Sequence, residues 1–184
     1  MASCVRTVAG LAFACVLWAG LAAPSAQAAG GCTSASVRPA QVSERALVRA
    51  TLCVLNAERT PRGLRPLTLN ARLSTAARRH ARDMAKRNYF SHTSLDGSSF
   101  LDRIRRAGYL RGARGWAAGE NIAWGTGALA TPRAIGRAWM QSPGHRANIL
   151  STSYREVGVG VAPGAPVRGL LSGATYATSF GARR

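Results

Sequence analysis

Acidic residues and histidines are scarce in this chain. Its 184 residues include 7 Asp and Glu and 3 His against 25 Lys and Arg, so the formal net charge is +18. This excess is expected to attract anions, namely envelope polymers, anionic lipids or nucleic acid. The arginines are spread along the chain without a nucleic-acid-reading motif, so we expect no specific nucleic-acid partner. A GC-rich genome also produces Arg-, Ala- and Gly-rich chains, so charge alone does not identify a ligand.

Several catalytic motifs are absent. The chain has no Gly-x-Ser-x-Gly turn for a serine nucleophile, no glycine-rich phosphate loop and no paired Cys-x-x-Cys metal site. It also has no internal repeat, no low-complexity linker and no long uncharged run beyond its N-terminus. We therefore expect a globular protein without a transmembrane helix once the N-terminal segment is removed.

The first 28 residues are typical of a secretory signal peptide. Arg6 supplies a positive charge, an almost wholly apolar run follows, and Ala26-Gln27-Ala28 is a small-x-small cleavage site. The apolar run of about 16 residues is shorter than the roughly 20 residues of a membrane-spanning helix. We predict export and removal of residues 1–28, with an uncleaved N-terminal anchor as the alternative.

Cysteine is rare as well. Cys4 and Cys15 lie in the predicted signal peptide, which leaves Cys32 and Cys53 in the mature chain. Two cysteines in an oxidising environment are a candidate disulfide, although two unrelated thiols remain the alternative. A bridge would tie an N-terminal segment, residues 29–43, to the first helix.

Hydrophobic periodicity and capping residues predict the helices. Ser43 and Asn70 each precede an apolar stripe, Ser98 or Ser99 can cap a short third helix, and Thr131-Pro132 starts a later one. The expected helices span residues 44–60, 71–88, 100–107 and 132–141, with one or two helical turns at 145–150.

Strand signals come mostly in the second half. Val157-Gly158-Val159-Gly160-Val161 alternates with a period of two, and its glycines leave one face bare for close approach of another layer. Residues 170–180 are the expected last strand. Residues 119–125 become strand-like after a loop at 110–118. The expected helices lie mostly in the first half of the chain and the strands in the second half. This order favours an α+β sandwich over a doubly wound sheet.

Two histidines and one glutamate are the candidate site residues. His92 and His145 lie in expected loops, and Glu120 lies between glycine-bounded turns. Two imidazoles and a carboxylate suit a divalent metal with an open water position, or an acid–base pair. The three are far apart in sequence, so three unrelated residues remain the alternative. His80 falls on the apolar stripe of the second helix and is expected in the core or behind a site.

Several segments together resemble one family, the bacterial CAP superfamily (cysteine-rich secretory proteins, antigen 5 and pathogenesis-related proteins, or SCP-like proteins). The segments are Leu55-Asn56-Ala57-Glu58-Arg59, Tyr89-Phe90-Ser91-His92, Gly119-Glu120-Asn121-Ile122, Ala138 to Leu150, Val157-Gly158-Val159-Gly160 and Thr178-Ser179-Phe180-Gly181. The resemblance places the CAP domain at residues 44–184.

The resemblance implies a three-layer α-β-α sandwich with a cleft lined by two histidines and two acids. His92, Glu120 and His145 match three of these positions. Eukaryotic members have a second glutamate where this chain has Met140-Gln141-Ser142, so Ser142 is expected near that position. With one carboxylate fewer, zinc or another divalent metal at His92 and His145 is expected to bind more weakly.

Three functions remain open, because CAP proteins include lipid or sterol binders, defence and venom proteins and occasional hydrolases. The favoured one is a secreted, monomeric, non-catalytic binding module, extracellular or associated with the cell wall, whose ligand is a lipid or an anionic envelope polymer. The second is a metal-assisted hydrolase or protease with His92 and His145 as ligands and Glu120 as base. The third is a structural envelope protein without a ligand.

Overall fold

The computed structural model describes residues 31–170 and 172–184. The predicted signal peptide, residues 1–28, lies outside these ranges, so its removal stays a prediction. Across the described ranges, no helix combines the length and the apolar character needed to cross a membrane.

Four strands form one sheet in the order β1-β3-β4-β2. β1 (Thr68–Leu69) runs parallel to β3 (Glu156–Pro163). β4 (Ala174–Arg183) lies between β3 and β2 (Trp116–Gly125) and is antiparallel to both. β2 is therefore an edge strand, and residues from both helical layers can reach its outer edge.

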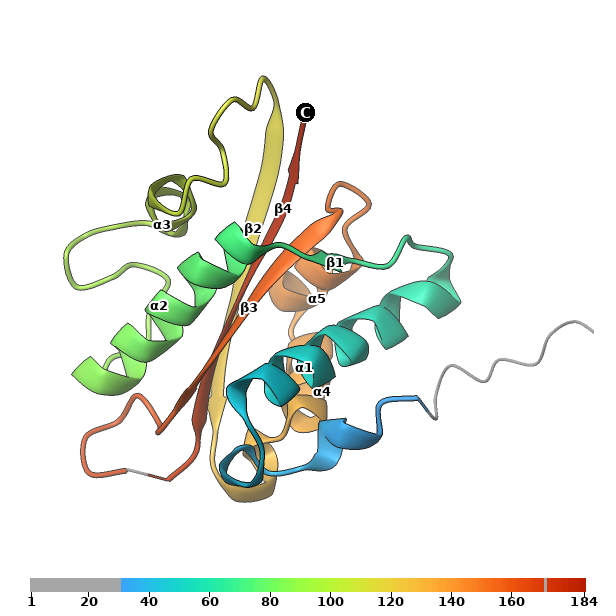
Figure 1. Cartoon of the computed structure of the whole chain (residues 1–184). Coiled ribbons are helices and arrows are strands. Elements are labelled where there is room, and N and C mark those ends of the chain that lie inside the picture. The colour runs from blue at the N-terminus through green and yellow to red at the C-terminus, as the bar shows by residue number, and fades with distance from the viewer. Residues whose placement is uncertain (1–30, 171) are drawn as a thin grey trace, which may run out of the picture.

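Helices cover both faces of this sheet (Figure 1). α2 (Ala71–Arg87) and α3 (Phe100–Arg106) lie on one face, with α2 packed mainly on β3 and β4. α1 (Glu44–Arg59), α4 (Pro132–Gln141) and α5 (Pro143–Leu150) lie on the other. The predicted three-layer α+β sandwich is confirmed.

The predicted capping residues begin α1, α2, α3 and α4. The side chains of Ser43, Asn70, Ser99 and Thr131 each accept a hydrogen bond from a backbone N–H in the first turn of α1, α2, α3 and α4. These bonds satisfy donors that have no partner within the helix, which is why the helices start at these residues.

Two glycines of β3 let α2 lie directly on the sheet. A Cβ at Gly158 would collide with the backbone of Leu73, and one at Gly160 would collide with the backbone of Arg78. Only glycine avoids a collision at either position. The predicted close approach of another layer to this face of the strand is therefore confirmed. The valines that alternate with these glycines point to the opposite face and join the core beneath α1, α4 and α5.

Four details of the elements differ from the sequence predictions. β2 begins at Trp116, inside the segment 110–118 expected as a loop, because its pairing with β4 extends that far. β4 begins at Ala174, four residues later than expected. α5 confirms the helical turns expected at 145–150 but starts two residues earlier, so His145, which was also expected in a loop, lies within a helix. β1 has only two residues, too few for a periodic pattern.

Cys32 and Cys53 form a disulfide, as expected. It joins α1 to the chain just before a short 3-10 turn, η2 (Thr33–Ser36). Arg133 of α4 donates to the carbonyl oxygen of Cys32 at 3.1 Å and to Oγ of Ser36 at 2.9 Å. The segment that precedes α1 is thus fastened to two helices. The predicted division into an N-terminal segment, residues 29–43, and a CAP domain, residues 44–184, stays a prediction.

Removing this disulfide should lower the free energy of unfolding by about 3 kcal/mol. The cysteines are 21 residues apart, and in the chain-entropy model a loop of that size restricts the unfolded chain by about this amount. Urea unfolding of a Cys32→Ser/Cys53→Ser variant should show a clearly lower midpoint than the wild type. An unchanged midpoint would refute the expectation that the bridge stabilises the fold.

Candidate functional site

Glu120 is the buried centre of the site. It lies in the middle of β2, opposite Ser179 of β4, and its side chain is on the face that α2 and α3 cover. Only 1% of this side chain is exposed. A buried carboxylate is unfavourable unless charged and hydrogen-bonded partners surround it, so the partners decide what Glu120 can do.

Arg103 of α3 neutralises this carboxylate. Its Nη2 donates to Glu120 Oε1 at 2.9 Å and to Oε2 at 2.8 Å. The guanidinium also donates to the carbonyl oxygens of His92 and Ser98, at 2.8 and 3.1 Å, and to Oγ of Ser94 at 2.9 Å. Only 9% of the Arg103 side chain is exposed. The ion pair therefore joins α3 and the loop before it to β2.

His92 lies on the solvent side of this ion pair. Its Nδ1 is 2.9 Å from Glu120 Oε1, and 53% of its side chain is exposed. An ionised carboxylate only accepts hydrogen bonds, so Nδ1 carries the hydrogen. In the neutral ring, Nε2 is then the basic nitrogen. Glu120 thus fixes both the tautomer and the orientation of His92.

His145 approaches β2 from the opposite layer. Its carbonyl oxygen accepts a hydrogen bond from Asn121 Nδ2 at 3.0 Å. Asn148, nearly one turn later, donates to Asn121 Oδ1 at 2.8 Å and to the carbonyl oxygen of Glu120 at 3.1 Å. These bonds hold α5 beside the edge strand. Burial lowers the pKa of His145, and the charge of His92 lowers it further, so the neutral ring is favoured.

Ser142 lies apart from this network. It is half-buried at the junction of α4 and α5, where its carbonyl oxygen accepts a hydrogen bond from the N–H of Arg146 at 2.9 Å. No hydrogen bond links its side chain to His92, Glu120 or His145 in the part of the chain that the structure describes. The structure therefore joins His92 and Glu120 directly, brings His145 to the same strand edge, and leaves Ser142 outside their hydrogen bonds.

A three-ligand metal site made of His92, Glu120 and His145 does not fit these contacts. Within residues 31–170 and 172–184, no three His, Cys, Asp or Glu side chains are grouped closely enough to hold a metal ion. Both oxygens of Glu120 already accept hydrogen bonds from Arg103. Glu120 instead orients His92 through Nδ1, as carboxylates do behind metal-binding histidines. Of the three candidate residues, only His92 and His145 then remain as metal ligands.

Arg103, Asn121 and Asn148 contact the site but were not among its predicted residues. Arg103 is one of three arginines in α3, and nothing in their spacing shows which one turns inward. The available signal was Glu120 itself, because a glutamate between buried strand residues requires a cation. His80 was expected in the core or behind a site, and it is buried with 1% exposed.

Acidification should destabilise the protein. Burial lowers the pKa of both His80 and His145 from the ordinary histidine value of about 6.5. The folded state then binds fewer protons than the unfolded state, so this contribution to stability is complete above about pH 6.5 and is lost as the pH falls below that value. The melting temperature should fall between about pH 7.5 and pH 5, and less so in a His145→Gln variant. A pH dependence that is identical in the variant would rule out a contribution from His145.

A family model matches most of the chain. Residues 52–178 match the model described as the cysteine-rich secretory protein family, CAP. The uncharacterized protein YkwD of Bacillus subtilis (strain 168) is 40% identical over 124 residues, which are 66% of this chain and 44% of that protein. The chain thus spans less than half of this relative's length.

Two solved structures share the fold. An extracellular protein containing an SCP domain from Bacillus anthracis str. Ames has a TM-score of 0.59 and 28% identity, over 74% of this chain and 40% of that one. An outer surface protein from Borrelia burgdorferi has a TM-score of 0.64 and 18% identity, over 78% of this chain and 97% of that one. At 18% identity, the second shows similarity of fold alone.

Proposed function

The chain belongs to the cysteine-rich secretory protein (CAP) family, and on this premise we propose that it is a secreted, non-catalytic module that binds an anionic component of the cell envelope, either a polymer or an acidic lipid. The signal-like residues 1–28 support export, as does the Bacillus anthracis relative, which is described as extracellular. The proposal concerns a monomer and the activity of this domain alone.

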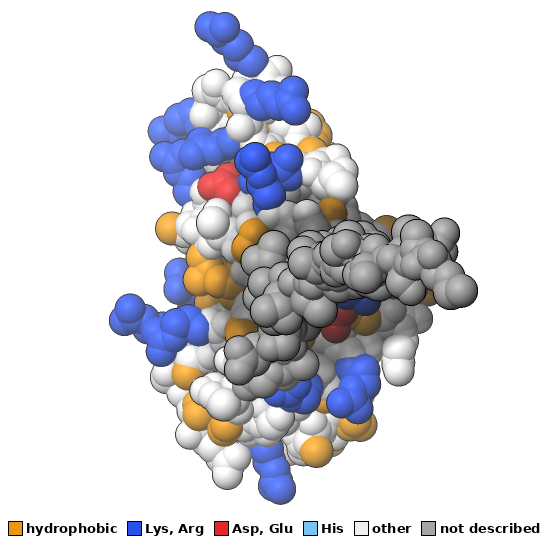
Figure 2. Space-filling model, turned by 90° about the vertical axis from the view of Figure 1, so that its right-hand side faces the viewer, with side chains coloured by type: hydrophobic (Ala, Val, Ile, Leu, Met, Phe, Trp, Pro, Cys, Tyr) orange, Lys and Arg blue, Asp and Glu red, His pale blue; other side chains and the backbone are white. Residues whose placement is uncertain are grey.

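The observation that carries this proposal is the unbalanced positive charge of the described surface. Each of the seven acidic side chains already has an ion-paired or hydrogen-bonded partner within the chain. The arginines paired with those acids are Arg62, Arg82, Arg87, Arg103, Arg105 and Arg106. In Figure 2, Lys and Arg side chains project from the periphery of one face and few acidic side chains are visible. The other cations have no acidic partner in the described residues, and those at the surface, unlike the buried Arg59, are available to external anions.

The contacts of Glu120 favour binding over hydrolysis. A general base needs a lone pair that can reach a substrate proton. Both carboxylate oxygens of Glu120 instead accept hydrogen bonds from a nearly buried Arg103, and one of them also contacts His92. These hydrogen bonds occupy the carboxylate oxygens that the metal-assisted hydrolase hypothesis requires of Glu120 as base.

The proposal can be tested by cosedimentation of the purified protein with cell-wall fragments and with vesicles that contain an acidic phospholipid. At an ionic strength of about 0.15 M we expect retention on at least one of them, and release as the salt approaches about 1 M, where the Debye length falls from about 8 to about 3 Å. Vesicles of a zwitterionic lipid are the control and should retain little protein.

A matched pair of variants separates binding through the surface from binding through the histidine site. An Arg49→Gln/Arg78→Gln/Arg137→Gln variant removes three exposed arginines that have no acidic partner in the described residues, and it should be released at lower salt. A His92→Ala/His145→Ala variant should be retained like the wild type. Absence of retention on every anionic surface would leave the structural hypothesis as the better one.

A further inference from the structure

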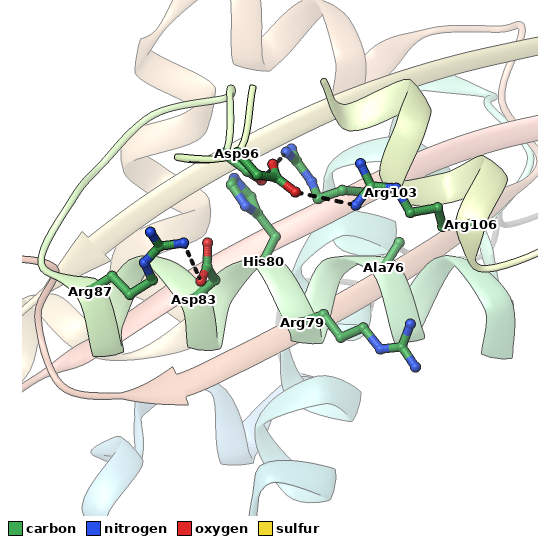
Figure 3. A pocket seen from close by; sticks show the side chains of 9 residues that line it. Ala76, Arg79, His80, Asp83, Arg87, Asp96, Arg103 and Arg106 are labelled. Carbon is green, nitrogen blue, oxygen red and sulfur yellow. Dashed lines mark hydrogen bonds and ion pairs between the residues drawn. The ribbon is translucent and has the colours of Figure 1, made fainter. Parts of the chain in front are cut away.

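A polar pocket lies between α2, α3 and the loop that connects them (Figure 3). Its volume is about 260 Å³, and His92, Glu120 and His145 are not among its lining residues. The charged and titratable lining residues on the two helices are Arg79, His80, Asp83, Arg87, Arg103 and Arg106. Pockets for drug-sized ligands start at about 300 Å³, so this pocket has room only for a smaller molecule.

The pocket has more positive charge than its own acids neutralise. Asp83 accepts a hydrogen bond from Tyr89 and lies 3.7 Å from Arg87, and Asp96 lies 3.5 Å from Arg106. Both arginine pairs are long and open to solvent, which makes them weak.

Arg79 adds a charge at the edge of the pocket. No acidic residue pairs with it in the described part of the chain, and its side chain is exposed. Arg103 is already paired with Glu120, but Arg79, Arg87 and Arg106 are available to a carboxylate or a phosphate through charge-assisted hydrogen bonds.

His80 adds a different requirement. It projects from α2 toward the pocket, on the side of Asp96 and Arg103 (Figure 3), and 1% of it is exposed. Its Nε2 lies 2.9 Å from the carbonyl oxygen of Ser91. A carbonyl only accepts, so Nε2 carries the hydrogen and Nδ1 of the neutral ring is an acceptor.

That acceptor has no partner. His80 Nδ1 is buried and makes no hydrogen bond within the described residues. A buried polar atom without a partner is unfavourable and is rarely left so in a folded protein. Because Nδ1 can only accept, an anion alone does not satisfy it. The missing partner must offer a hydrogen, as a hydroxyl group can.

We propose that this pocket binds a small, hydroxyl-bearing anion, a sugar acid or a polyol phosphate. The acidic group lies among Arg79, Arg87 and Arg106, and a hydroxyl donates to His80 Nδ1. The two carboxylates of the pocket accept the remaining hydroxyls. Such a ligand belongs to the class of envelope anions proposed above. Only its location in the envelope rests on that proposed function.

The test is titration of the full chain, followed by NMR, with four probes: glucuronate, glycerol 3-phosphate, acetate and glucose. At physiological salt we expect saturable binding of glucuronate or glycerol 3-phosphate, with shifts of the α2 and α3 amides and of the His80 Nδ1 nitrogen. Whichever of the two binds more tightly identifies the carboxylate or the phosphate as the acidic group. Acetate lacks hydroxyls and glucose lacks charge, so neither should move the His80 signal.

Neighbouring arginines provide a matched control. Arg79→Gln should weaken binding about tenfold, since it removes a charged hydrogen-bond donor. Arg78→Gln makes the same charge change one residue away on α2, outside the pocket lining, and should change binding less than about twofold by long-range electrostatics. Equal losses in the two variants, or acetate binding as tightly as glucuronate, would overturn the inference.

The outcomes also separate this inference from the proposed function. If the protein is retained on envelope surfaces but neither glucuronate nor glycerol 3-phosphate saturates it, the pocket contains only water and the inference is wrong, while the proposed function stands. If these anions saturate the pocket but no envelope surface retains the protein, the inference stands and the proposed function fails.

Discussion

Replacing Glu120 with glutamine should lower the free energy of unfolding by about 3–5 kcal/mol, a large part of the roughly 5–15 kcal/mol that stabilises a typical domain. The two side chains have nearly the same shape, so the change opens no cavity. It leaves the charge of Arg103 without its counter-charge in a site where only 9% of the arginine side chain is exposed. Urea unfolding of the variant and the wild type measures the difference.

Two control variants define what the loss means. His92→Ala should cost no more than about 1 kcal/mol, because 53% of the His92 side chain is exposed and exposed ion pairs contribute little. A Glu120→Leu/Arg103→Met double variant removes both charges and should recover much of the stability, since an apolar pair can replace a buried ion pair. If Glu120→Gln cost no more than His92→Ala, the Glu120–Arg103 pair would not be the centre of the site.

The relative stability losses of these three variants also help to distinguish a catalytic role of Glu120 from a structural one. A residue kept for catalysis is expected to matter more for activity than for stability, whereas a bonded pair that holds α3 against β2 is expected to matter mainly for stability. A large stability loss at Glu120 with unchanged retention on envelope surfaces would agree with the binding proposal, in which the arginines of the surface contact the ligand.

Much of the fold could be predicted because its signals are local. Ser43, Asn70 and Thr131 cap the helices that follow them, and period-two alternation identified β3. The misplaced bounds are those that depend on distant pairing. Trp116 joins β2 only because Arg183 lies opposite it, and no pattern within either segment shows this register.

The candidate site was predicted less completely for a related reason. His92 and Glu120 were chosen by residue type and family resemblance, and the structure places them 2.9 Å apart. The arginine that neutralises Glu120 could not be chosen in this way, because Arg103, Arg105 and Arg106 are equivalent in sequence. Only the packing of α3 on the sheet turns Arg103 inward and leaves the other two exposed.

Arg59 is a second buried cation, and its contacts are with backbone carbonyls. It is fully buried at the end of α1. Its Nη1 donates to the carbonyl oxygens of Ile149 and Ser151, at 2.6 and 3.0 Å, and its Nε donates to that of Arg65 at 2.9 Å. Burial lowers the pKa of Arg59, yet an arginine remains charged at neutral pH. Arg59 thereby joins α1 to the end of α5, the helix that contains His145.

Replacing Arg59 with methionine should lower the free energy of unfolding by about 3–5 kcal/mol, because buried carbonyl oxygens at the end of α5 lose their donors. Hydrogen exchange should quicken in α5 before the sheet unfolds, which would show that Arg59 holds the helix beside Glu120. Arg62→Met is the matched control: Arg62 pairs with Glu58 at the surface with 43% of its side chain exposed, and its loss should cost about 0.5 kcal/mol or less. Equal losses at the two positions would mean that the carbonyl contacts of Arg59 do not support the site.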